Sequence, residues 1–332
     1  MLILNPNPCF SRTLLVKHFE RGAVMRAPSA EVRAGGKGVD SARVAHSLSR
    51  KAPLIALVGD RDADEYCRLF FDEKLDFRYT THSGYVRVAT MYIEEVSRNT
   101  TIVNEEGASI SSQDWENYLD AISIEIKPGE IVLCMGSFPH GVNQASIKAL
   151  VDLVHQKQSL ILFDTAPHFL SYALLAGADI VSPNLDEAEA VINSSSEDFF
   201  TGDITDGKNR AMKASAQLHQ MGAEIAIVHA GALGSAMTYG AKTIFLSSPI
   251  VKVVSTVGAG DSLAAGFALK SEEQGDVRDF DAINWEQSLQ FGLAAAANSC
   301  ERGRSGEIEP DRVHEIFLQV GRVGLEPTTT EL

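Results

Sequence analysis

Residues 250–270 read IVKVVSTVGAGDSLAAGFALK and contain the most informative pattern of the chain. A β-branched run leads into the turn Gly258-Ala259-Gly260-Asp261, and a segment rich in Ala and Leu follows. The pattern predicts a strand, a glycine turn and a helix whose first N–H groups attract anions such as phosphate. An acidic residue in such a turn repels phosphate, which favours a chemical role for Asp261, such as accepting a proton from a hydroxyl. In a second interpretation Asp261 or Ser262 only caps the helix.

The sequence before this stretch alternates between apolar runs and amphipathic segments. The runs predict buried strands at 131–135, 159–164, 179–182 and 224–229, and the segments between them predict helices at 143–157, 169–176, 185–192 and 207–221. Continuous apolar strands that alternate with helices are typical of a parallel sheet covered on both faces. The sequence therefore predicts an α/β fold with a mostly parallel central sheet.

Two early segments break this rhythm. Residues 12–34 and 76–104 contain short alternating stretches without a helical stripe, which predicts antiparallel strands in a small β-sheet lid. The α/β core then comprises residues 1–11, 35–75 and 105–320. Residues 193–206 are rich in Ser, Asp and Gly and predict an exposed loop. Residues 321–332 lack periodicity and predict a disordered tail.

Composition excludes several classes of function. The formal net charge is −15, so a broad basic footprint for nucleic acid is absent. No stretch approaches 18 consecutive apolar residues and the N-terminus lacks a signal peptide pattern, so we expect no membrane association. The four cysteines are far apart, which argues against a zinc site or a disulfide framework and predicts a cytoplasmic protein.

Two other phosphate-binding motifs fit the sequence poorly. A dinucleotide fingerprint requires Gly or Ala where Leu263 stands, and it belongs in the first strand–helix unit of a chain. The Walker pattern G-x-x-x-x-G-K-[ST] does not occur. The glycine turn at 258–261 therefore belongs to a different kind of phosphate site.

Two glycine motifs together identify a family. The segment 256–262, with Ala265-Gly266-Phe267 after it, resembles the C-terminal signature of the ribokinase-like (PfkB) carbohydrate kinases. The segment 34–39, AGGKGV, resembles the N-terminal signature of the same family. Residues 4–8 and the turn 136–141 are similar to the 1-phosphofructokinase and tagatose-6-phosphate kinase branch. The resemblance implies a ribokinase-like α/β domain with a β-sheet lid that often mediates homodimers.

The resemblance also implies the roles of residues on the nucleotide side. Asp261 matches the catalytic base, and the N–H groups around Gly258, Ala259 and Gly260 match the anion hole for the transferred phosphoryl group of ATP. Asn184 and Glu187 match a P-N-x-x-E motif that organises Mg²⁺, with Glu187 acting through water; in an alternative interpretation they only cap a helix. The other residues implied to contact the nucleotide are His229, Gly231, Gly234 and Asn298.

On the acceptor side, the resemblance implies a phosphorylated sugar. Gly35, Gly36 and Lys37 match the glycine-rich substrate segment, while Arg87 and Ser137 match residues that hold the existing phosphate of the substrate. Three positions depart from the family pattern. Ser11 replaces an Asp and Asp40 an Asn, both at positions that grip sugar hydroxyls, and Ser182 replaces a Lys beside the P-N-x-x-E motif.

The function implied is therefore ATP- and Mg²⁺-dependent phosphorylation of a phosphorylated ketohexose to a bisphosphate. The acceptor would be of the fructose 1-phosphate, fructose 6-phosphate or tagatose 6-phosphate type. The departures at Ser11 and Asp40 favour an alternative, a kinase for a non-phosphorylated sugar or a nucleoside. The departure at Ser182 favours a non-catalytic sugar or nucleotide sensor with the same fold.

Overall fold

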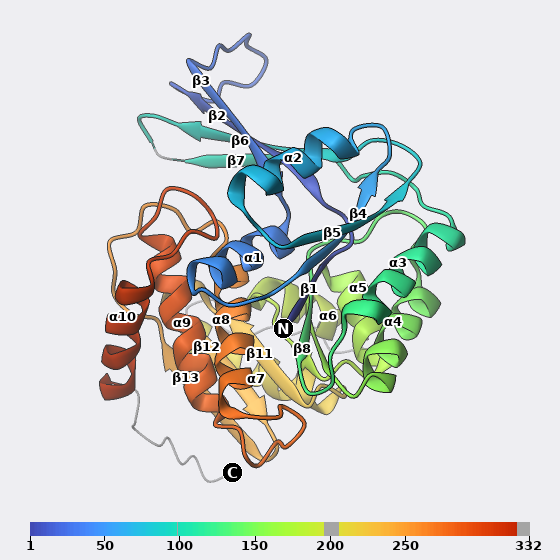
Figure 1. Cartoon of the computed structure of the whole chain (residues 1–332). Helices are drawn as coiled ribbons and strands as arrows, with labels where there is room; N and C mark the ends of the chain where they lie inside the picture. The colour runs from blue at the N-terminus through green and yellow to red at the C-terminus, as the bar shows by residue number, and fades with distance from the viewer. Residues whose placement is uncertain (98, 196–205, 324–332) are drawn as a thin grey trace.

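The structure of the chain is a computed structural model that describes residues 1–97, 99–195 and 206–323 (Figure 1). Most of these residues form one large mixed sheet with helices on both faces, and a smaller sheet projects from one end. Among the described residues, no helix has the length and apolar character needed to cross a membrane.

The large sheet is parallel except at one edge. In the described residues its strand order is β13-β12-β11-β10-β9-β8-β1-β4-β5, and only the pairs β11–β12 and β12–β13 are antiparallel. Its strands are β1 Leu2–Asn5, β4 Leu54–Gly59, β5 Phe77–His82, β8 Ile131–Met135, β9 Leu160–Asp164, β10 Ile180–Val181, β11 Ile225–His229, β12 Gly234–Tyr239 and β13 Lys242–Ser247. The central strands are buried throughout, as expected for parallel strands covered on both faces.

The helices form two layers, each over its own apolar core. One core lies under α1 Lys37–Ser47, α2 Ala63–Glu73, α8 Ala259–Gln274, α9 Trp285–Cys300 and α10 Pro310–Val323. The other lies under α3 Ser112–Glu125, α4 Gln144–Gln156, α5 Pro167–Ala176, α6 Leu185–Ser195 and α7 Gly207–Gln220. Alternate residues of one strand point into different cores: Ile3 enters the first, and Leu2 and Leu4 enter the second. The predicted α/β architecture is confirmed.

The small sheet is the lid. Its strand order is β3-β2-β6-β7, built from β2 Cys9–Val16, β3 Ser29–Gly35, β6 Arg87–Glu94 and β7 Thr100–Asn104. Figure 1 shows it extending away from the helices beyond α2. Strand β3 ends at Gly35 and α1 begins at Lys37, so the lid leads directly into the glycine-rich segment.

The prediction that all of residues 76–104 stands apart from the main sheet is wrong for β5. This strand pairs in parallel with β4 and forms an edge of the main sheet. The side chain of Phe77 stacks on that of Phe70 in α2, with ring centroids 3.8 Å apart. An alternating pattern fits a strand with one covered face, but it does not say which sheet the strand joins.

The predicted helices and strands between 131 and 229 occur within a few residues of their expected bounds. Two predicted irregular segments extend beyond the described residues. The predicted loop 193–206 overlaps the end of α6 as far as Ser195, and residues 196–205 lie outside the described residues. The predicted disordered tail is wrong for residues 321–323, which continue α10, and residues 324–332 lie outside the described residues.

Candidate active site

The glycine turn at 258–261 forms the start of α8, as the sequence predicts. The strand predicted before the turn is wrong, because residues 250–257 form no strand and join no sheet. Gly258 is the N-cap residue with φ of 82°, a left-handed conformation that favours glycine, and no side chain caps the helix. The hydroxyl of Ser262 donates instead to the Gly258 carbonyl, at 2.8 Å. The interpretation in which Asp261 or Ser262 caps the helix is therefore wrong.

The first amides of α8 differ in what they bind. The N–H of Ala259 donates to the carbonyl of Thr256 at 3.3 Å. In the part of the chain that the structure describes, the N–H groups of Gly260 and Asp261 have no hydrogen-bond partner. Residues 258–260 are half-buried, so the backbone of this turn remains accessible. These two free amides are available to a negatively charged ligand.

Asp261 is 7% exposed, and its carboxylate accepts no hydrogen bond from any residue that the structure describes. Its carboxylate oxygens retain some contact with solvent. Burial raises the pKa of Asp261 well above its usual range; Lys37 opposes this shift, and Asp40, Asp164 and Glu187 add to it. A carboxylate with a raised pKa and free lone pairs is suited to accept a proton.

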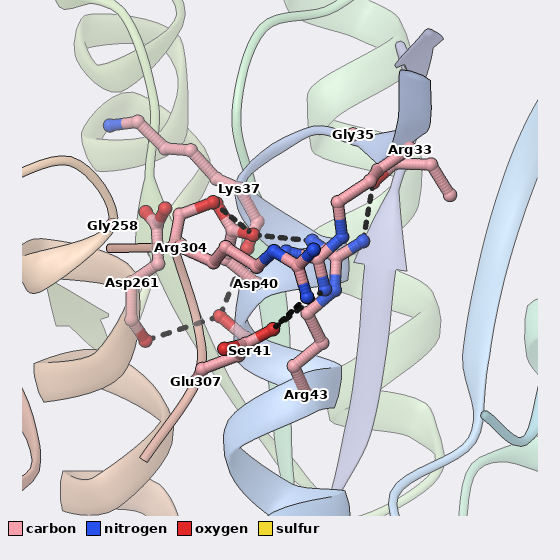
Figure 2. Close-up of polar contacts among 12 residues, drawn as sticks. Arg33, Gly35, Lys37, Asp40, Ser41, Arg43, Gly258, Asp261, Arg304 and Glu307 are labelled. Atoms are coloured by element: carbon pink, nitrogen blue, oxygen red, sulfur yellow. Dashed lines mark hydrogen bonds and ion pairs between the residues drawn. The ribbon is translucent and has the colours of Figure 1, made fainter. Parts of the chain in front are cut away.

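Lys37 stands at the first position of α1, opposite the start of α8 (Figure 2). Its Nζ lies 2.5 Å from Oδ1 of Asp164, and its side chain is 37% exposed. Burial disfavours the ammonium, but Asp164, Asp261 and Glu187 outweigh this and raise the pKa of Lys37. Lys37 therefore stays charged, in an ion pair with Asp164 and in the electrostatic field of Asp261 and Glu187.

The Ser41 side chain on α1 links this helix to the start of α8. The hydroxyl of Ser41 lies 3.2 Å from the Lys37 carbonyl and 3.2 Å from the Asp261 carbonyl. Gly36, just before α1, has φ of 117° and packs so closely on Asn5 that an added Cβ would lie 2.6 Å from the Asn5 amide nitrogen. The predicted substrate segment Gly35-Gly36-Lys37 therefore leads into a helix that is hydrogen-bonded to the turn at Asp261.

Two of the four other predicted acceptor-side residues, Arg87 and Ser137, both contact Asn7. The guanidinium of Arg87 donates to the Asn7 carbonyl through Nε at 3.1 Å and Nη2 at 3.0 Å, and to the Glu105 carbonyl through Nη1. The side-chain amide of Asn7 donates to Ser137 Oγ at 3.0 Å. Asn7 thus brings together a lid residue and a residue from the loop after β8.

Two predicted acceptor residues occupy different surroundings. Ser11 lies in β2, where it pairs with Arg33 and Ala89 and packs against Gly35. Asp40 lies on α1, and its Oδ1 accepts from Arg43 Nη1 at 2.7 Å and from Ser305 Oγ at 2.9 Å. Asp40 therefore forms an ion pair with Arg43, a guanidinium that it shares with Glu73.

Asn184 and Glu187 form a reciprocal cap at the start of α6. The N–H of Asn184 donates to Glu187 Oε2 at 3.0 Å, and the N–H of Glu187 donates to Asn184 Oδ1 at 2.9 Å. Burial raises the pKa of Glu187, Lys37 opposes this, and Asp164 adds to it. These two bonds confirm the capping interpretation, and Lys37 and Asp164 act electrostatically on the Glu187 carboxylate as they do on that of Asp261.

The carboxylates suit a magnesium ion that keeps most of its water. Glu187 and Asp164 both act electrostatically on Lys37, and their hard oxygens are the ligands that Mg²⁺ prefers. No group of three or more His, Cys, Asp or Glu side chains is arranged to hold a metal within residues 1–97, 99–195 and 206–323. Mg²⁺ bound through one or two carboxylates and the phosphates of a substrate needs no such group.

The remaining predicted nucleotide residues serve internal contacts. His229 Nε2 lies 2.8 Å from Ser182 Oγ, and its Nδ1 lies 3.2 Å from Ser235 Oγ. Burial lowers the pKa of His229, so the ring is neutral at neutral pH. Gly231 and Gly234 flank the 3₁₀ turn η1 Gly231–Leu233 between β11 and β12.

Asn298 is fully buried and holds the loop that follows α9. Its Nδ2 donates to Glu301 Oε2 at 2.9 Å, and its Oδ1 accepts from the Glu309 N–H at 2.6 Å. Both polar atoms of the side chain are therefore occupied by the protein.

Sequence reasoning missed two residues of the site, Asp164 and Asn7. Asp164 ends β9, and a carboxylate at the carboxyl end of a parallel strand was the available signal. Asn7 lies in the segment 4–8, which carries part of the family resemblance. Its role was not predicted, because no local pattern distinguishes it from a turn residue.

The fold and the site define a class of protein. A mostly parallel sheet, a separate β lid, and an uncapped helix start beside a buried carboxylate are typical of small-molecule kinases with the ribokinase-like fold. The family model described as "pfkB family carbohydrate kinase" matches residues 7–312, and the chain belongs to this family. It is therefore a phosphotransferase with an alcohol group as acceptor, and the family implies ATP as the phosphoryl donor.

Individual relatives agree with this assignment. The chain is 24% identical to 1-phosphofructokinase of Escherichia coli (strain K12) over 323 residues, which cover 97% of this chain and 96% of the relative. It is 26% identical to 1-phosphofructokinase of Rhodobacter capsulatus over 262 residues, which cover 78% and 80%. A structure of phosphofructokinase-2 from Escherichia coli in complex with potassium has the same fold, with a TM-score of 0.85, 22% identity, and coverage of 97% and 99%.

Proposed function

We propose that the chain phosphorylates a phosphorylated ketohexose with ATP, with Asp261 as the catalytic base, and releases a sugar bisphosphate and ADP. The observation that carries the proposal is the start of α8, where two unpartnered amides lie beside a carboxylate that has no hydrogen-bond partner in the described residues. Curated relatives named 1-phosphofructokinase support a sugar phosphate as the acceptor.

In this mechanism Asp261 takes the proton of the acceptor hydroxyl while the hydroxyl oxygen forms a bond to the γ-phosphorus of ATP. The bond between the γ-phosphorus and the β–γ bridging oxygen breaks, and ADP leaves with that oxygen. The free N–H groups of Gly260 and Asp261 stabilise the charge on the transferred group, and Gly258 and Ala259 shape the turn that presents them. Lys37 adds a positive charge close to Asp261.

The acceptor would lie between the start of α1 and the base of the lid. Gly35 and Gly36 let the sugar approach the backbone, and Arg87 and Ser137, joined through Asn7, bind its existing phosphate. Three backbone carbonyl contacts fix the Arg87 guanidinium, which reduces the conformational entropy lost when a phosphate binds. Ser11 lies at the lid side of the same segment.

The nucleotide would lie over α8 and the ends of β10 and β11. Mg²⁺, when bound with ATP, would neutralise phosphate charge; Glu187 and Asp164 would hold its water ligands, and Asn184 would orient Glu187. His229 and Asn298 would support the nucleotide site indirectly, because their side chains bind other residues of the protein. Gly231 leaves open space beside the turn between β11 and β12, whereas Gly234 packs directly against the backbone of β13.

Assembly and location complete the proposal. The family resemblance supports a homodimer through the lid, whose two edge strands β3 and β7 carry the exposed apolar residues Val32, Ile102 and Val103. Sedimentation equilibrium would test this, and a monomer at micromolar concentration would contradict it. A cytoplasmic location stays a prediction, and fractionation of cells that produce the protein would test it.

The proposed function is tested by measuring ADP release with Mg²⁺ and ATP across a panel of acceptors. We expect turnover with fructose 1-phosphate, fructose 6-phosphate or tagatose 6-phosphate, and little with fructose or a nucleoside. Arg87→Ala should raise the KM for the sugar phosphate about tenfold or more, because a charged hydrogen-bonding partner of phosphate is lost. Arg78→Ala, which removes an exposed ion pair with Asp76, is the matched control.

Two results would contradict the proposal. One is the absence of ADP release with every phosphorylated ketohexose when the protein is folded, as judged by a cooperative thermal transition. The other is equal turnover of phosphorylated and free sugars with no effect of Arg87→Ala, which would favour the kinase for a non-phosphorylated acceptor.

A further inference from the structure

A loop between α9 and α10, residues 301–309, reaches the site from the C-terminal part of the chain. Both of its ends are fixed by Asn298, through Glu301 and through the N–H of Glu309. Arg302 and Glu309 pair across the base of the loop. The tip of the loop, Ser305-Gly306, is therefore held by a short segment whose two ends are bonded to each other and to Asn298.

The tip contacts α1 through Asp40. A single oxygen, Oδ1 of Asp40, accepts from Ser305 Oγ at 2.9 Å and from Arg43 Nη1 at 2.7 Å. Gly306 also lies against the α1 backbone, because an added Cβ there would be 2.6 Å from the Asp40 carbonyl oxygen. The loop is thus both hydrogen-bonded to α1 and in close contact with it.

The same tip contacts the anion-binding turn on its other side. A Cβ added to Gly258 would lie 2.8 Å from the Ser305 Cβ, so Ser305 packs directly on the residue that caps α8. Figure 2 shows Asp40, Ser41 and Arg43 on α1 beside Gly258 and Asp261. Ser305 therefore lies between a residue of the predicted acceptor segment and the turn that presents the free amides.

The carboxylate of Asp40 is itself held in place. Arg43 is buried, and its guanidinium also donates to both carboxylate oxygens of Glu73 and to the Ala34 carbonyl. A buried guanidinium with this many partners has one position, and it fixes the oxygen that binds Ser305.

We propose that Asp40 is a positioning residue: held by Arg43, it sets Ser305 against Gly258 and thereby fixes the amides at the start of α8. This inference rests on the proposed function. It gives Asp40 a different task from the sugar contact that the resemblance implies, because its Oδ1 is already occupied by two partners within the protein.

The two tasks predict different behaviour of matched variants. Asp40→Asn keeps a carbonyl oxygen that accepts from both Ser305 and Arg43, whereas Asp40→Ala removes it. We expect Asp40→Ala and Ser305→Ala each to lower kcat about tenfold with less than a twofold change in the KM for the sugar phosphate, because the transferred group loses alignment. Asp40→Asn should keep kcat within about twofold of the wild type, since the acceptor atom remains.

A double variant and a structural control sharpen the test. Asp40→Ala with Ser305→Ala should be no slower than either single variant, because both remove one contact. Ser271→Ala removes a buried hydrogen bond of α8 to the Phe267 carbonyl and should change stability without changing kcat. The proposal is overturned if Ser305→Ala is neutral, if Asp40→Asn is as damaging as Asp40→Ala, or if the KM for the sugar rises instead.

The inference can fail separately from the proposed function. If the wild type releases no ADP with any acceptor, hydrogen exchange of the peptide spanning 256–262 gives the answer without turnover. Asp40→Ala and Ser305→Ala should speed exchange there, where the amides of Ala259 and Ser262 are hydrogen-bonded, and Asp40→Asn should not. Unchanged exchange in both alanine variants would overturn the inference.

Discussion

The helices α6 and α8 begin with similar residue types but differ in how their first backbone N–H groups are hydrogen-bonded. Each follows a strand or turn and carries an acidic residue in its first turn, Glu187 in α6 and Asp261 in α8. At α6 the side chains of Asn184 and Glu187 occupy backbone N–H groups of the same turn. At α8 no side chain caps the helix, and the described residues offer no partner to the carboxylate of Asp261 or to two of the amides.

The difference separates structural from chemical use of the same residue types. A capping box satisfies donors that would otherwise be free and stabilises the helix by about 1 kcal/mol. Leaving donors free costs that stabilisation and keeps them available to an anion. We therefore expect the transferred phosphoryl group at the start of α8, where backbone N–H groups are free. The capped start of α6 is expected to have a supporting role.

The largest effect should come from removing the base at α8. Asp261→Asn keeps the shape of the side chain but removes its capacity to accept a proton, so kcat should fall at least 10²- to 10⁴-fold, the range typical of general-base catalysis. Binding of ATP, measured by calorimetry, should change little. Asp186→Asn, in the exposed first turn of α6, is the matched control and should retain kcat. If Asp261→Asn kept more than a tenth of the wild-type kcat, Asp261 would not be the catalytic base, and α8 would not differ from α6 in chemical use.

A smaller effect is expected on the pH dependence of the reaction. Burial raises the pKa of Asp261, Lys37 opposes the shift, and Asp40, Asp164 and Glu187 add to it. Because the base must be ionised, kcat/KM should fall as the pH drops through this raised pKa and should level off above it. Asp40→Asn removes one negative charge, so the acidic limb should move to lower pH. A limb in the range of an ordinary aspartate, near pH 4, or one that Asp40→Asn leaves in place, would contradict this account.

Much of this site follows from local sequence. The turn at 258–261 and the cap at Asn184 are short patterns in which neighbouring residues set the backbone, so each was predictable where it stands. The parallel sheet followed from buried apolar runs such as 131–135 and 160–164. In these places the physical cause lies within a few residues of its effect.

What was not predictable depends on distant partners. The alternation in β5 suits either sheet, and only its pairing with β4 decides which one it joins. Asp164 meets Lys37 across 127 positions, and Ser305 meets Asp40 across 265. No local pattern encodes such contacts. The family resemblance implied a sugar contact for Asp40, whereas in the structure Arg43 and Ser305 donate hydrogen bonds to its carboxylate.

The smallest effect, and the finest test of the comparison, lies at α6. Glu187→Gln keeps an acceptor for the Asn184 N–H, so the cap and the thermal stability should be retained, while loss of the charge should raise the Mg²⁺ concentration for half-maximal rate several-fold. Asn184→Ala removes the other half of the cap and should lower the free energy of unfolding by about 1 kcal/mol. If Glu187→Gln leaves the Mg²⁺ dependence unchanged while Asn184→Ala lowers stability as expected, α6 is a structural helix start alone. The carboxylate that faces the metal would then have to be Asp164, which lies 2.5 Å from the Lys37 ammonium and acts on Glu187 from the end of β9.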